Sequence, residues 1–145
     1  MIIIKIILLI WLLIMSVLDI RYGSFGKKTL LVSMAIFGIM MGIVCYFNLA
    51  DWKMVLAGGA MGVLFMIISI ATCGKIGMGD GYLLTVCGLV LGVYQMLILL
   101  MLAFGLSSIW GICLLIGKRA TRNTKIPFAP FVCSGYGVIL LCAML

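Results

Sequence analysis

Three aspartates, Asp19, Asp51 and Asp80, are the only acidic residues of this 145-residue chain, and the chain has no histidine. Without histidine, Ser–His and Cys–His nucleophilic pairs and histidine-based metal sites are excluded. None of the six cysteines belongs to a Cys-x-x-Cys pair, and Gly77-x-Gly79 is not followed by the Lys-Ser or Lys-Thr of a phosphate-binding loop. The remaining option is chemistry that carboxylates perform alone, with no metal and no cofactor.

Two carboxylates that lie close together can hydrolyse a peptide bond. They cannot both ionise without a large cost, so one keeps its proton while the other is charged. The charged carboxylate takes a proton from the attacking water, and the protonated one polarises the peptide carbonyl. Asp80 lies between glycines in the segment KIGMGDGYLL. Because glycine has no Cβ, a neighbouring helix or a substrate backbone can approach this aspartate closely.

The composition indicates the elements that must position these aspartates. Hydrophobic residues make up 67% of the chain and charged residues 9%, against roughly 45–50% and about 25% in soluble domains. Apolar runs predict membrane-spanning helices over residues 1–18, 29–49, 54–73 and 128–145. The run 81–117 is long enough for two crossings of about 18 residues, with a turn near Gly92–Gln95. We therefore expect an all-α integral membrane protein with six transmembrane helices in one domain, residues 1–145.

The basic residues predict the orientation of these helices. Eight of the ten lie in the first, third and fifth loops, at positions Arg21, Lys27, Lys28, Lys75, Lys118, Arg119, Arg122 and Lys125. Lys5 and Lys53 are left for the other side, and Lys5 is expected to extend toward an interface. The positive-inside rule then places these three loops in the cytoplasm and both termini outside. The net charge of +7 thus indicates membrane orientation beside anionic lipid rather than nucleic-acid binding.

The same topology sorts the three aspartates. Asp19 ends the first helix and Asp80 precedes the fourth, so both are expected at the cytoplasmic face, where they can meet. Asp51 is expected on the opposite side, beside Trp52 in an interfacial loop. Three Gly-x-x-x-Gly patterns, which begin at Gly38, Gly58 and Gly88, predict seams where helices pack closely.

Three segments carry the most specific patterns of the chain: LDIRYGSFGKK at Leu18–Lys28, GMGD at Gly77–Asp80 and KIPFAPFVCSGYG at Lys125–Gly137. Together they resemble one family of membrane aspartic proteases, the type IV prepilin peptidases and their archaeal preflagellin relatives. They are similar, in this order, to the family's first aspartate segment, its Gly-x-Gly-Asp motif and the start of its last helix. The three segments occur in the family's order on six expected helices.

The resemblance implies that Asp19 and Asp80 are catalytic, and that the other matching positions support them: Arg21, Gly77, Gly79, Pro127 and Pro130. It implies prepilin-like precursors as substrates, cut after the glycine that ends a short basic leader, at the cytoplasmic face of a prokaryotic cell membrane. Such precursors belong to type IV pilus and protein-secretion systems. Larger members carry an N-terminal cytoplasmic region with N-methyltransferase activity. This chain begins at the first helix, so we expect a peptidase only.

The chain departs from the family pattern at three places. Phe25-Gly26-Lys27 stands where the family has Ile-Pro-Asn, Tyr82 replaces a lysine, and Ala129 replaces a glycine. We expect these changes to affect the choice of leader more than the chemistry.

Other interpretations of the aspartates stay open. Asp80 can serve as the N-cap of the following helix, and Asp19 can pair with Arg21 or the nearby lysines, Lys27 and Lys28, as a solvated interfacial charge. A small non-enzymatic transporter, or an inactive assembly factor built on the peptidase scaffold, is the alternative function, because intramembrane acids also line ion paths. A transporter is expected to place its acid near the midplane, often within a repeat. Both relevant aspartates are expected at one boundary instead, which favours the enzyme.

Overall fold

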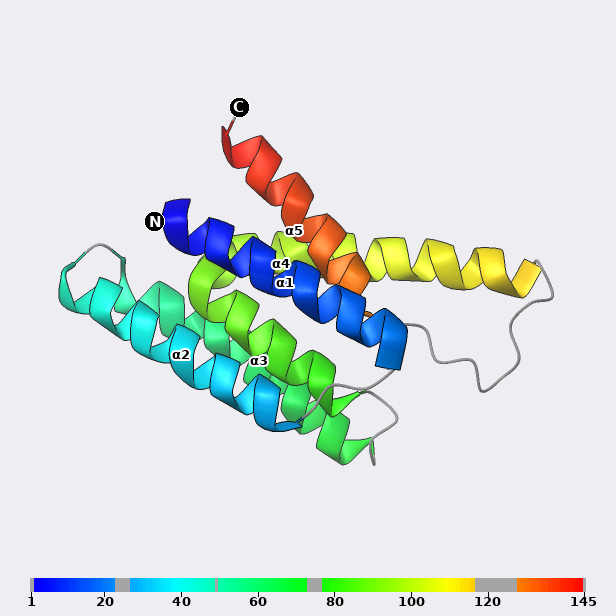
Figure 1. The fold of residues 1–145 in the computed structure, drawn as a ribbon, viewed down its shortest axis with the longest axis horizontal. Coiled ribbons are helices and arrows are strands. Elements are labelled where there is room, and N and C mark those ends of the chain that lie inside the picture. Colours follow the sequence, from blue (N-terminus) through cyan, green and yellow to red (C-terminus); the bar gives the residue numbers. More distant parts are fainter. Residues whose placement is uncertain (1, 23–26, 49, 73–76, 117–127, 145) are drawn as a thin grey trace.

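The computed structural model describes residues 2–22, 27–48, 50–72, 77–116 and 128–144 (Figure 1). Within these ranges the chain forms five helices: α1 (Ile2–Tyr22), α2 (Lys27–Tyr46), α3 (Trp52–Ala71), α4 (Met78–Ile116) and α5 (Ala129–Met144). Several positions singled out in the sequence lie outside the described residues: Phe25, Gly26, Lys75, Lys118, Arg119, Arg122, Lys125 and Pro127. The all-α class expected from the sequence is confirmed.

The helices have the length and composition of membrane spans. Within the described ranges, α1 to α4 are each long and apolar enough to cross a membrane, and the apolar part of α5, Ala129–Ala143, is shorter. A lipid environment offers the backbone no hydrogen-bonding partners, so a spanning segment must satisfy its own N–H and C=O groups as a helix. Large apolar side chains such as Ile10, Ile39 and Ile67 are exposed on the outer surface. The chain is therefore a multi-pass membrane protein by these criteria, while six spans and their orientation stay a prediction.

A kink divides α4 into two helical segments. Gly92 has φ 71° and ψ 178°, a backbone conformation essentially restricted to glycine. Figure 1 shows that the chain reverses its direction across the view at this kink. The turn that the sequence predicts near Gly92–Gln95 thus falls at a real break in the helix.

Glycines allow α3 to pack tightly on the first segment of α4. A Cβ on Gly58 would overlap the carbonyl oxygen of Gly88, and a Cβ on Gly62 would overlap the backbone of Thr85. The seams predicted at Gly58 and Gly88 are therefore real contacts. Gly38 and Gly42 on α2 differ, because a Cβ on either would meet no described heavy atom within 4 Å. The seam predicted on α2 is not found among the described residues, because no described atom approaches either glycine closely enough to pack against it.

This difference predicts the outcome of a pair of substitutions. Gly62→Val should force α3 and α4 apart and lower the free energy of unfolding by about 3 kcal/mol. Gly42→Val should change it by less than about 0.5 kcal/mol, because nothing in the structure opposes the new side chain. Thermal unfolding in detergent, followed by tryptophan fluorescence, compares the two variants. Equal stability of both variants would contradict the tight α3–α4 seam.

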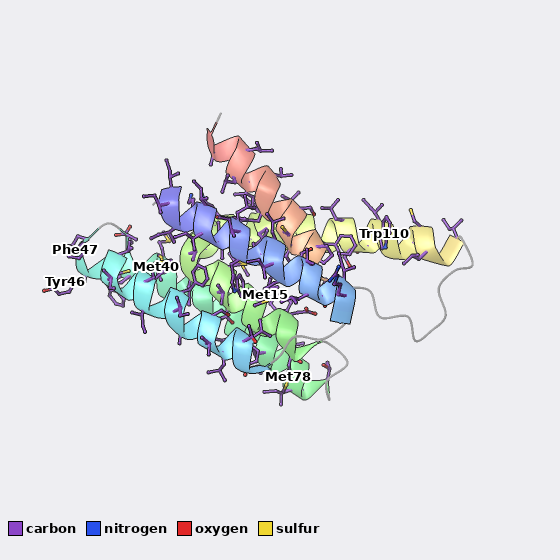
Figure 2. The ribbon with its side chains drawn as sticks, in the orientation of Figure 1. Met15, Met40, Tyr46, Phe47, Met78 and Trp110 are labelled. Atoms are coloured by element: carbon purple, nitrogen blue, oxygen red, sulfur yellow. The ribbon has the colours of Figure 1, made fainter. Side chains whose placement is uncertain are left out.

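The arrangement of the helices places the ends of several elements together. α4 packs against α2, α3 and α5, and α1 packs against α5 and α4. The last turn of α1 and the first turns of α2 and α4 lie at one end of the bundle (Figure 1). Figure 2 shows Met78, at the start of α4, at this end, with Tyr46 and Phe47 at the opposite end of α2. The elements that carry Asp19 and Asp80 therefore share one end of the molecule.

Candidate active site

Asp19 lies in the last turn of α1 and is bound to the start of α5. Its side chain is 8% exposed, and its Oδ2 accepts a hydrogen bond from the N–H of Ala129 at 3.2 Å. Asp19 is thus buried and bound to a helix terminus, whereas Arg21 is exposed. The side chains of Lys27 and Lys28, the other partners considered for Asp19, lie outside the described part of the chain.

The sequence at the start of α5 explains why this helix end binds an anion. The first N–H groups of a helix have no partner within it, and the helix dipole adds partial positive charge there. Pro130, in the first turn, has no N–H group of its own. The N–H of Ala129, the first residue of α5, is free to bind a partner outside the helix, and it donates to Asp19. Asp19 therefore links the end of α1 to the beginning of α5.

Asp80 lies in the first turn of α4 and is half-buried. Its N–H donates a hydrogen bond to the carbonyl of Gly77 at 3.0 Å. A Cβ on Gly77 would lie 3.1 Å from Oδ2 of Asp80, so the carboxylate is folded back over this glycine. Because α4 begins at Met78, Gly77 occupies the N-cap position and Asp80 follows three residues later. The alternative in which Asp80 is itself the N-cap is therefore wrong.

The last turn of α1, which carries Asp19, and the first turn of α4, which carries Asp80, lie at the same end of the bundle (Figure 1). The third aspartate lies elsewhere. Asp51 is exposed and immediately precedes α3, where its side chain makes no capping hydrogen bond. It follows the end of α2 that carries Tyr46 and Phe47, away from Met78 (Figure 2). The described residues thus group two of the three carboxylates at one end of the bundle.

The other predicted site positions are distributed around this pair. Gly77 is exposed, Gly79 and Pro130 are partly buried, and Arg21 is exposed in the last turn of α1. Tyr82, at a position where the sequence departs from the family pattern, packs partly buried against the core. Pro127 lies outside the described residues. No group of three or more His, Cys, Asp or Glu side chains that could hold a metal ion occurs in the part of the chain that the structure describes.

Two features beside Asp19 were not predicted from the sequence. The sequence marks Ala129 only as a departure from the family pattern that alters the choice of leader. In the structure its N–H donates a hydrogen bond to the buried carboxylate of Asp19. The second feature is a row of three aromatic rings. The centroid of the Phe104 ring lies 5.7 Å from that of Phe65 and 5.4 Å from that of Phe128. The three rings connect α3, the second segment of α4 and the residue that precedes α5. Phe128 belongs to the KIPFAPF segment that the sequence singles out, but its ring partners could not be predicted because they come from distant elements.

Comparison of the sequence with models of protein families gives one result that includes the candidate site. The model of the type IV leader peptidase family matches residues 6–116. This range includes both Asp19 and Asp80 and ends before α5. Comparison with curated proteins and with solved structures gave no match.

Proposed function

Because the chain belongs to the type IV leader peptidase family, we propose that it is a membrane aspartic endopeptidase in which Asp19 and Asp80 activate water together. One observation carries this proposal: two of the three carboxylates lie in helix turns, the last of α1 and the first of α4, that meet at one end of the bundle. One of them, Asp19, is buried and accepts a hydrogen bond from the backbone N–H of Ala129. Ionisable residues within membrane-spanning helices are costly and mark functional sites.

The environments of the two carboxylates suggest separate roles. The hydrogen bond from the N–H of Ala129 favours the charged form of Asp19, so in this proposal Asp19 accepts the proton of the attacking water. Two carboxylates close together do not both ionise, so Asp80, half-buried at the start of α4, keeps its proton and donates it toward the peptide carbonyl oxygen. The water oxygen bonds to the carbonyl carbon. The tetrahedral intermediate then breaks its C–N bond as the amine takes the proton held by Asp19, and Asp80 recovers its own.

The proposed substrates are prepilin-like precursors with a short basic leader before a hydrophobic helix. We propose cleavage at the cytoplasmic boundary of a prokaryotic cell membrane, by a single six-helix domain with both termini outside. The distribution of basic residues supports this orientation. The reversal of the chain at Gly92 supports two crossings within residues 78–116.

The proposed chemistry predicts a characteristic response to metal chelation and to pH. Cleavage should survive chelators, because two carboxylates provide fewer ligands than the roughly three of a catalytic zinc site. The rate should follow a bell-shaped pH profile. It falls at low pH as the charged carboxylate takes up a proton, and at high pH as the second one loses its proton. Co-expression or co-reconstitution with a precursor, followed by gel mobility of the shortened product, measures both properties.

A metal-dependent result would contradict this chemistry. If a chelator stops cleavage and an added divalent cation restores it, the aspartates act as metal ligands rather than as an acid–base pair. The family assignment would still stand in that case, because it rests on the match over residues 6–116.

A further inference from the structure

A second polar cluster joins three helices far from the aspartates. Lys5 on α1 donates a hydrogen bond from Nζ to Oε1 of Gln95 on α4, at 3.3 Å. Tyr136 on α5 donates from its hydroxyl to the backbone carbonyl of Lys5, at 2.9 Å. The side chain of Tyr136 is fully buried. The sequence predicts that Lys5 extends toward an interface, and the structure adds the Gln95 amide as its hydrogen-bond partner.

A lysine, an amide and a phenol packed between apolar helices are costly to bury unless they bind one another. Gln95 lies just beyond the kink at Gly92, so the cluster ties α1 and α5 to the point where α4 changes direction.

The cluster and Asp19 lie at two separated points along α1. Lys5 and Asp19 are 14 positions apart in the sequence, which corresponds to about 21 Å along a helix. On α5, Ala129 and Tyr136 are about two turns apart and lie on the same face. α1 is thus attached to α5 twice, through Asp19 at one end and through Lys5 at the other.

The two aspartates, in contrast, belong to different packing pairs. Asp19 is carried by α1, which packs on α5, while Asp80 is carried by the segment of α4 that packs tightly on α3. The position of Asp19 relative to Asp80 therefore depends on how α1 is tilted against α4. The hydrogen bond between Lys5 and Gln95 links these two helices directly.

We propose that Lys5, Gln95 and Tyr136 form a positioning cluster that fixes the tilt of α1 and thereby the approach of Asp19 to Asp80; this inference rests on the proposed peptidase function. With the cluster as a pivot, a tilt of about 5° would move Asp19 by about 2 Å over the 21 Å between them. A displacement of about 1 Å in catalytic geometry can lower a rate by about 100-fold. The cluster acts through Asp19 and does not touch the substrate.

Tyr136→Phe tests this role because it removes only the hydroxyl. We expect kcat to fall about 10-fold while KM stays within about twofold, since substrate binding does not involve the cluster. The matched control is Tyr94→Phe, whose side chain is 70% exposed and whose loss of a hydroxyl should leave both constants unchanged. Unchanged kcat per folded molecule in Tyr136→Phe, with lower stability alone, would overturn the positioning role.

The pair of Lys5 and Gln95 gives an independent check. Lys5→Leu and Gln95→Leu should each lower kcat, and the double variant should be no slower than the slower single variant, because both remove one hydrogen bond. Lys5→Arg, which keeps a donor, should recover most of the rate. Additive losses in the double variant, with no recovery in Lys5→Arg, would overturn the shared role.

A distance measurement separates this inference from the proposed function. Spin labels at positions 21 and 78, the exposed ends of α1 and α4, can be attached after Arg21→Cys and Met78→Cys in a variant whose six native cysteines are replaced by alanine. We expect Tyr136→Phe to shift or widen the distance distribution between these labels. An unchanged distribution would overturn the positioning role whether or not the protein cleaves a precursor. Failure of the unaltered chain to cleave any precursor would instead contradict the proposed function.

Discussion

Asp19→Asn and Asp80→Asn should each lower the rate of leader cleavage by at least about 1,000-fold. Asparagine keeps the size of the side chain and its capacity to accept a hydrogen bond, but it can neither take a proton from water nor donate one as an acid. General acid–base groups contribute roughly 100-fold to 10,000-fold each, and in a pair that acts as a unit the loss of one partner removes most of the combined effect. Release of the leader from a precursor in proteoliposomes, followed by mass, measures the loss.

The control for this prediction is Asp51→Asn. Asp51 is exposed beside α3, and its replacement should leave cleavage and membrane insertion as they are. Gel filtration in detergent should show that all three variants remain folded, so that the comparison reports chemistry. Cleavage at more than a few per cent of the normal rate by Asp19→Asn or Asp80→Asn would contradict the acid–base pair.

Ala129→Pro should lower cleavage about 100-fold. Proline at the first position of a helix keeps the helix intact, but it removes the N–H that binds Oδ2 of Asp19 at 3.2 Å. A hydrogen bond to a charged group contributes roughly 1.5–3 kcal/mol, which corresponds to about 10-fold to 150-fold in rate if the whole contribution is felt in the transition state. The expected loss therefore lies in kcat, which initial rates over a range of precursor concentrations determine.

Ala129→Gly is the matched comparison, because it removes the buried methyl group and retains the N–H. We expect it to remain within about threefold of the unaltered protein. Since the family pattern has glycine at this position, the same variant also tests whether Ala129 changes leader preference. Equal losses in Ala129→Pro and Ala129→Gly would show that packing of the methyl group, rather than the hydrogen bond to Asp19, is what matters here.

The sequence predicted the helices well because few physical solutions exist for long apolar runs. Such a run in lipid must satisfy its backbone internally, so the predicted ranges agree with α1 to α5 to within a few residues at most ends. The break near Gly92 was predicted because residues 81–117 are too long for one crossing, and a glycine there can adopt the required positive φ.

The pairing of these helices could not be read from local patterns. Gly38 and Gly58 each begin a Gly-x-x-x-Gly pattern, yet only the one on α3 meets another helix among the described residues. Small residues along one face of a helix permit close packing, but they do not specify which helix packs against that face. The alternation of helices and loops was enough to predict that Asp19 and Asp80 lie at the same end of the bundle. It could not predict the hydrogen bond from the N–H of Ala129 to Asp19. That contact depends on how α5 approaches α1 across 110 positions of sequence.

The most direct test of the central claim is the mass of the products formed from a precursor. The purified chain is reconstituted in lipid vesicles with the pilin-like precursors of its own host, and the mixture is analysed by intact mass. We predict a new fragment that corresponds to the basic leader ending in glycine, together with the shortened precursor, and neither product with the Asp19→Asn variant. Precursors that remain intact, under conditions in which another member of the family cleaves them, would contradict the claim that Asp19 and Asp80 form a working peptidase site.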